Sequence, residues 1–155
     1  MHNDLEIRLA TINDLSGIIK LVTETLHSFG FNYDKTGSES DLENFAAVYL
    51  QPGSKFFVIR DGLEIIGTVG LARISDDVVK IRKMYVKSRL QGKGHGLKLL
   101  RAVVHEAKLL GYKVIRLETS HAMLSAIRLY KNFGFLAIPR KPDSSRCDIT
   151  FEFNL

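Results

Sequence analysis

Residues 91–96 read Gln-Gly-Lys-Gly-His-Gly and separate two stretches of different pattern. The stretch 78–86 before them is rich in β-forming residues, and the stretch 97–110 after them carries apolar residues at helical spacing. The start of a helix offers several unpartnered N–H donors and about half a positive charge, and glycines leave these donors uncovered. This strand–loop–helix junction therefore predicts a site for a phosphate-bearing ligand.

The charged residues are unevenly distributed along the chain. Residues 1–50 carry three basic residues against eight acidic ones, although the whole chain has a formal net charge of +5. The stretch 78–105 carries eight basic residues and no acidic one. Beside a glycine-rich helix start, this excess favours a polyanionic ligand over a plain solvated surface.

The composition predicts one globular domain over residues 1–155, long enough to bury a core without disulfides or metals. No apolar run could cross a membrane, and the N-terminus lacks the pattern of a signal peptide. Cys147 is the single cysteine, which excludes an internal disulfide and a cysteine-based metal site. We therefore expect a cytoplasmic protein without a metal.

Seven strand-like and four helix-like stretches follow one another in the order β-α-α-β-β-β-α-β-α-β-β, which predicts a mixed α/β fold. The β-α-β unit around the glycine loop favours two parallel strands, and Asp61-Gly62 predicts an antiparallel hairpin. The strands are expected at 6–10, 55–60, 63–74, 78–86, 112–119, 135–138 and 147–153, and the helices at 12–26, 38–51, 97–110 and 122–133.

Two details refine these elements. Arg82 and Lys83 are consecutive polar residues inside an apolar strand, which indicates one extra residue and hence a β-bulge. Ser38 with Asp41 has the spacing of a capping box and predicts the start of the second helix.

The spacing of the glycines distinguishes between known phosphate loops. A Walker loop requires a glycine at position 97 and a Ser or Thr after the lysine, and neither is present. A dinucleotide fingerprint requires a different glycine spacing and repeated βαβ units. The pattern that fits is Gln/Arg-x-x-Gly-x-Gly/Ala, with Gln91, Gly94 and Gly96.

In this loop the sequence resembles the GNAT superfamily of acetyl-CoA-dependent N-acetyltransferases. A second block, residues 126–135 (Ala-Ile-Arg-Leu-Tyr-Lys-Asn-Phe-Gly-Phe), is similar to the family's Leu-Tyr-x-x-x-Gly-Phe segment, and residues 81–86 match its central strand. The order of elements agrees over residues 5–154. The resemblance implies a single domain with a mostly antiparallel twisted sheet of about seven strands and about four helices.

The resemblance also implies acetyl-CoA as the acetyl donor and no metal. The N–H groups of residues 90–97 would hold the pyrophosphate, and the bulged strand would pair with the pantetheine arm and polarise the thioester carbonyl. The residues expected to bind the coenzyme are Met84, Tyr85, Val86, Gln91, Gly92, Lys93, Gly94, His95, Gly96, Leu97, Lys98 and Tyr130.

Two residues are candidates for catalysis. Tyr130 stands where many relatives have the tyrosine that protonates the departing thiolate, and the alternative is a core aromatic residue. Lys80 occupies the position of a glutamate base found in several members, so the base is unassigned, and Glu118 is a candidate beside a water chain or an already neutral amine. His95 and His121 are weaker candidates, and Met123 replaces an asparagine of many relatives.

The resemblance implies an acceptor pocket built from the first two helices, the loop between them and the final hairpin. Phe29, Phe31 and Tyr33 of that loop are expected to contact an amine with an apolar portion, and the alternative is that Phe29 and Phe31 only pack the loop against the core. The predicted reaction is acetyl transfer to a primary amine of a small molecule or peptide by direct attack. Dimers are common in the family. The alternatives are an inactive coenzyme A-binding regulatory module and, from the basic stretch alone, a nucleic-acid binder; we expect neither nucleic acid nor membrane as a partner.

Overall fold

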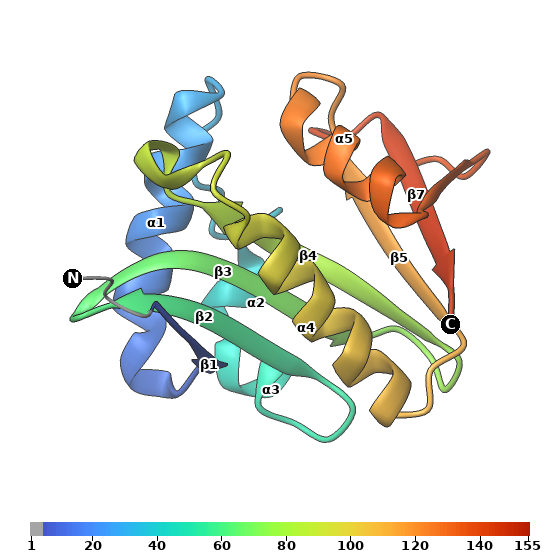
Figure 1. Cartoon of the computed structure of the whole chain (residues 1–155), viewed down its shortest axis with the longest axis horizontal. Coiled ribbons are helices and arrows are strands. Elements are labelled where there is room, and N and C mark those ends of the chain that lie inside the picture. The colour runs from blue at the N-terminus through green and yellow to red at the C-terminus, as the bar shows by residue number, and fades with distance from the viewer. Residues whose placement is uncertain (1–4) are drawn as a thin grey trace.

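The computed structural model describes residues 5–155 as three layers around a seven-stranded sheet (Figure 1). The strands lie in the order β1-β2-β3-β4-β5-β7-β6, and every neighbouring pair is antiparallel except β4 and β5. One apolar cluster packs α4 and α5 against one face of the sheet, and a second packs α1, α2 and α3 against the other. The mixed α/β class and the mostly antiparallel sheet are as predicted.

The strands and helices lie close to their expected places. The strands are β1 (Glu6–Leu9), β2 (Lys55–Asp61), β3 (Glu64–Arg73), β4 (Val78–Val86), β5 (Val114–Thr119), β6 (Leu136–Ile138) and β7 (Ile149–Asn154). The helices are α1 (Leu15–Ser28), α2 (Ser40–Glu43), α3 (Phe45–Tyr49), α4 (His95–Leu109) and α5 (Leu124–Phe133), and two short 3-10 turns, Ile12–Asp14 and Ser88–Leu90, precede α1 and α4.

The region 38–51 differs from the expected single helix. It forms the two short helices α2 and α3, which meet at Asn44, so residues 5–155 contain five helices rather than four. The predicted capping box is wrong as well, because Glu39 is the N-cap of α2. Asp41 is instead buried and accepts a hydrogen bond from the Tyr49 hydroxyl, which makes it part of the interior of the protein.

The predicted bulge in β4 is confirmed. The pairing of β3 with β4 shifts between Thr68–Tyr85 and Gly70–Arg82, and Lys83 has a φ of 53°. The shift reverses the alternation of side chains along β4. Val79 and Ile81 pack in the α4 layer before the bulge, whereas Met84 and Val86 do so after it.

The two central strands separate in the middle of the sheet. β4 and β5 pair in parallel over only four residue pairs, which end at Ile81 and Leu117. The remainder of β4, residues 82–86, has no neighbouring strand on that side within the described residues. This edge faces the two cavities described below. No helix of residues 5–155 is long and apolar enough to cross a membrane.

Candidate functional site

The glycine loop has the backbone that its sequence predicts. Gly92 and Gly94 adopt φ values of 76° and 86°, and Gly94 is the N-cap of α4. A methyl group at either position would meet no atom within 4 Å, so the requirement for glycine is conformational. Gly96 has a different reason, because a Cβ there would lie 3.1 Å from Cδ2 of Leu129 and would disturb the contact between α4 and α5.

Six consecutive N–H groups of this loop are uncommitted. The N–H groups of residues 92–97 meet no hydrogen-bond acceptor among residues 5–155. Leu90 and Gln91 were expected to add two more donors, but theirs bind the carbonyls of Lys87 and Ser88. The donors available to an anion are therefore those of residues 92–97 at the N-terminus of a 15-residue helix.

A cavity of about 500 Å³ extends from this loop between β4 and α5, and we call it the glycine-loop cavity. It contains ten of the twelve residues predicted to bind the coenzyme, and the exceptions are Lys93 and Lys98, which are exposed outside it. The Nδ1 atom of His95 is buried in its wall without a hydrogen-bond partner among the described residues. The lining residues are Thr25, Phe29, 84–86, 90–92, 94–97, 122–126, Leu129 and Tyr130.

A second cavity, of about 440 Å³, lies between β4, β5 and the loops before α2 and β7, and we call it the ion-pair cavity. It is lined by Leu26, Phe29, Phe31, Asp34, 37–39, 80–85, 117–120, Met123, Ala126, Tyr130 and 143–147. The two cavities meet at six residues that line both of them: Phe29, Met84, Tyr85, Met123, Ala126 and Tyr130. We call these six residues the junction.

Tyr130 lies at the junction and is 5% exposed. Its ring packs near Phe135 and Phe151, with centroids 5.9 and 6.2 Å away. Its hydroxyl makes no hydrogen bond to any of residues 5–155, and burial raises the pKa of the phenol above its usual value. Tyr130 is therefore a protonated phenol facing both cavities, and its ring is a core residue as well.

Tyr85 is the second phenol at the junction. Its pKa is also raised, chiefly by burial and further by the nearby carboxylate of Glu39. Cys147 lines the ion-pair cavity, and burial raises the pKa of its thiol. At neutral pH these groups are therefore uncharged.

Glu118, the candidate base, is held by three contacts. Its side chain accepts hydrogen bonds from the N–H groups of Asp143 and Ser144 at 2.9 and 3.2 Å. The ammonium of Lys80 lies 3.1 Å from its Oε2 atom and 3.4 Å from Asp143. Lys80, which stands at the family's glutamate position, thus forms an ion pair with Glu118, the candidate base.

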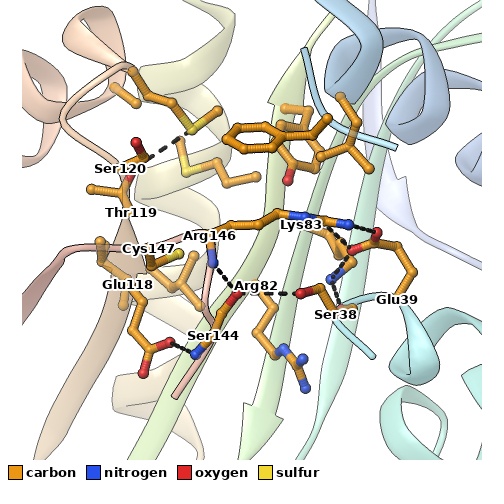
Figure 2. Close-up of a pocket in the computed structure, with 18 of the residues that line it drawn as sticks. Ser38, Glu39, Arg82, Lys83, Glu118, Thr119, Ser120, Ser144, Arg146 and Cys147 are labelled. Carbon is orange, nitrogen blue, oxygen red and sulfur yellow. Dashed lines mark hydrogen bonds and ion pairs between the residues drawn. The ribbon is translucent and has the colours of Figure 1, made fainter. Parts of the chain in front are cut away.

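A buried network of charges closes the ion-pair cavity (Figure 2). Arg146 donates two hydrogen bonds to the carboxylate of Glu39 at 2.7 and 2.9 Å, and a third to the Asn32 carbonyl. The ammonium of Lys83 lies 3.6 Å from Glu39 and 3.1 Å from Asp41, and it donates to the carbonyl of Ser38. A bridge between the Ser38 and Ser144 hydroxyls joins the same two loops.

The sequence did not predict this network. Glu39 and Arg146 are separated by 107 positions, and neither belongs to a motif. The only signal was the polar pair in β4 at Arg82 and Lys83, which the bulge turns toward α2. Burial lowers the pKa of Lys83, whereas the neighbouring acids oppose that shift.

Of the three residues predicted to contact the acceptor, two line the ion-pair cavity and one does not. Phe29 and Phe31 line the ion-pair cavity, and the guanidinium of Arg146 lies 5.7 Å from the ring centroid of Phe31. Tyr33 lines neither cavity, because its hydroxyl donates to Glu43. His121 lies outside both cavities and pairs with Asp148. Residues 5–155 contain no group of three metal-ligating side chains.

Comparisons with known proteins identify the family to which this sequence is similar. Residues 20–135 match the model of the Acetyltransferase (GNAT) family. The uncharacterized N-acetyltransferase YjgM of Escherichia coli is 30% identical over 83% of this chain and 80% of its own length.

Solved structures show the same fold. An acetyltransferase of the GNAT family from Staphylococcus aureus superposes with a TM-score of 0.90 at 26% identity and covers 97% of this chain and 99% of its own. The yncA protein of Salmonella typhimurium, solved with its cofactor acetyl-CoA, has a TM-score of 0.79 at 22% identity over 99% of this chain and 95% of its own.

Proposed function

The chain belongs to the GNAT family of acetyltransferases, and we propose that it transfers an acetyl group from acetyl-CoA to a primary amine of a small molecule or peptide. One observation carries the proposal. The two cavities meet at a junction that contains a protonated phenol, Tyr130. A donor in the glycine-loop cavity and an acceptor in the ion-pair cavity would therefore meet beside a proton donor.

The donor would lie along the loop and the open edge of β4. The N–H groups of residues 92–97 would bind its pyrophosphate at the N-terminus of α4. The pantetheine arm would run beside residues 84–86 in the manner of an added strand, because no strand of residues 5–155 pairs with this edge of β4 on the β5 side. A backbone donor aimed at the thioester oxygen contributes about 3 kcal/mol to such reactions.

The reaction would proceed by direct attack. The amine nitrogen forms a bond with the thioester carbonyl carbon, the carbon–sulfur bond breaks, and the sulfur takes a proton from Tyr130. The acceptor nitrogen loses its own proton to water, and water restores the proton of Tyr130. A water route fits the contacts of Glu118, since its two oxygens are already bound to Lys80 and to two backbone N–H groups.

The acceptor would place its apolar portion against Phe29 and Phe31. Both rings line the ion-pair cavity, and Phe29 belongs to the junction. Tyr33 would not contact the acceptor directly, because its hydroxyl is directed to Glu43.

An inactive coenzyme A-binding module is the second candidate. The observation that favours it is the ion pair between Lys80, which stands at the family's base position, and Glu118, the other candidate base, because this pair leaves neither group free to accept a proton. Such a module would retain the glycine-loop cavity and release no thiol from acetyl-CoA.

Two measurements separate these candidates. Acetyl-CoA should raise the thermal midpoint of the protein in either case, because a ligand that binds only the native state stabilises it. A panel of amines, amino acids, polyamines and short peptides should then release thiol from acetyl-CoA if the protein is a transferase. Stabilisation without thiol release from any acceptor would select the binding module, and activity confined to non-amine anions would exclude amine acetylation.

A further inference from the structure

Four cationic side chains line the ion-pair cavity, and three of them donate hydrogen bonds to carboxylate or carbonyl oxygens. Lys80 is paired with Glu118 and Asp143. Lys83 lies between Asp41 and Glu39 and donates to a backbone carbonyl, and Arg146 forms a two-point pair with Glu39. These three charges therefore maintain the architecture of the cavity.

Arg82 is the exception. Its closest acidic atom is Oδ2 of Asp41, 3.9 Å from Nε, and it makes no hydrogen bond to any of residues 5–155. Asp41 is already engaged, because its carboxylate binds the Tyr49 hydroxyl and the Lys83 ammonium. The Arg82 side chain is only 31% exposed, so most of its surface is removed from water. Figure 2 shows its guanidinium extending away from the Arg146–Glu39 pair.

The guanidinium of Arg82 has one long ion pair, to Asp41, and no hydrogen bond within residues 5–155, so its planar fork of N–H groups is available to bind a carboxylate in two-point geometry. We propose that Arg82 binds the carboxylate of the acceptor, and that the acceptor is a linear amino acid whose amine and carboxylate lie at opposite ends. This proposal rests on the acetyl transfer proposed above. The amine would lie at the junction, and the carboxylate would lie at the far end of the ion-pair cavity.

The position of Arg82 sets the length of the acceptor. Arg82 lines the ion-pair cavity but does not belong to the junction, whereas Met84, two residues further along β4, does. The bulge at Lys83 lies between them and turns Arg82 toward α2 and Met84 toward the α4 layer, which creates a gap between the guanidinium and the junction. An α-amino acid is too short to span it, because its amine and carboxylate share one carbon. A polyamine would bring a second positive charge against Arg82.

A series of chain-end amino acids tests the proposal. The probes are β-alanine, γ-aminobutyrate, δ-aminovalerate and ε-aminocaproate, each compared with its own primary amide. Binding to the coenzyme A-loaded protein is measured by calorimetry, and acetylation by thiol release from acetyl-CoA. At least one acid should bind at least tenfold more tightly than its amide, which is the usual range for a charge-assisted hydrogen bond. The preference should rise with chain length.

Arg82→Gln should abolish this preference and leave the affinity for acetyl-CoA unchanged. Arg82→Lys should retain part of it, because the charge remains without the fork. The thermal midpoint of Arg82→Gln should change little, since Arg82 makes one ion pair of 3.9 Å and no hydrogen bond within residues 5–155. Arg128 is a suitable control, because it is exposed on α5 outside both cavities, and Arg128→Gln should keep the preference of the wild type.

The outcomes distinguish this proposal from the proposed function. Acetylation with equal use of acids and amides, or a preference that persists in Arg82→Gln, would overturn the role of Arg82 and leave amine acetylation intact. A binding preference lost in Arg82→Gln but without any acetylated product would support the carboxylate site and contradict the transfer. If no acid binds more tightly than its amide, the carboxylate site is excluded.

Discussion

The two cavities differ in how far apart in the sequence the residues that form them lie. The glycine-loop cavity takes its anion donors from six neighbouring residues, 92–97, whose conformation depends on local glycines. The ion-pair cavity is closed by contacts such as Glu39–Arg146 and Ser38–Ser144, which join residues more than a hundred positions apart. The first is a product of local backbone conformation and the second of tertiary packing. Substitutions should therefore affect them in different ways.

The largest effect is expected at Glu39. Its side chain is 1% exposed and contacts the buried cations of Arg146 and Lys83. Glu39→Gln should lower the free energy of unfolding by about 3 kcal/mol, because it leaves buried charges without compensation. Urea denaturation measures this change.

Glu64 provides the matched control for this prediction. Its carboxylate also contacts two cations, Lys87 and Arg89, but it is 41% exposed. Glu64→Gln should destabilise the protein far less, since water screens an exposed pair. Equal losses in the two variants would show that burial of the network does not determine its contribution.

The next largest effect is expected where the cavities meet. Tyr130→Phe should lower kcat about 100-fold, which is the lower end of the usual contribution of a general acid. It should leave the Kd for acetyl-CoA unchanged. The fold should be preserved, because the hydroxyl makes no hydrogen bond within residues 5–155 and the ring packing is retained. Thiol-release kinetics with calorimetry of acetyl-CoA separates the two effects. An unchanged kcat would remove Tyr130 from the mechanism.

A smaller effect is expected from the backbone of the glycine loop. Gly94→Ala should cost about 1–2 kcal/mol of stability, because φ is 86° at this position. It should also weaken acetyl-CoA binding about tenfold, since the strained loop would spend less time in the binding conformation.

Gly111 is a control that separates the effect of backbone strain from a role in binding acetyl-CoA. Its φ is 84°, it follows the other end of α4, and a Cβ there would also meet nothing within 4 Å. Gly111→Ala should therefore cost the same stability without changing the Kd for acetyl-CoA. If both variants weaken binding equally, the loop has no particular role in holding the donor.

The smallest effect is expected at the bulge. Thr68 donates a hydrogen bond of 2.8 Å to the carbonyl of Lys83, and Thr68→Val should cost about 1 kcal/mol. Thr150→Val removes a bond of the same length, to the Arg140 carbonyl, and should cost a similar amount. Only Thr68→Val should reduce kcat, because Thr68 supports the strand beside the thioester. A reduced kcat in both variants would contradict that local role.

The same division explains what could be predicted from the sequence. The element order, the Asp61-Gly62 hairpin, the bulge and the loop of residues 91–96 were predicted because each depends on neighbouring residues. The break at Asn44 and the inward turn of Asp41 were not, because the buried partners Tyr49 and Lys83 determine them. Ser38 and Asp41 have the spacing of a cap, and tertiary contacts outweigh that local preference.

Tyr33 and Glu118 show the same limit within the candidate site. Both were selected for residue type and for position relative to a loop. Tyr33 lies instead against Glu43, and Glu118 against Lys80 and the loop before β7. Which partner a polar side chain meets depends on residues far away in the sequence, so a single sequence indicates the neighbourhood but not the contact.

The bulge in β4 can be regarded as a frameshift. A strand has a reading frame of two, in which alternate residues belong to opposite layers. Lys83 is the extra residue, so Arg82 and Lys83 both face α2. Before the bulge the odd-numbered residues lie in the α4 layer, and after it the even-numbered residues do. Deleting one residue at position 83 would restore the original frame. Met84 would stay in the α4 layer and Tyr85 on the opposite side, so the deletion would remove the Lys83 ammonium from between Glu39 and Asp41 and leave the facing of every other side chain of β4 unchanged.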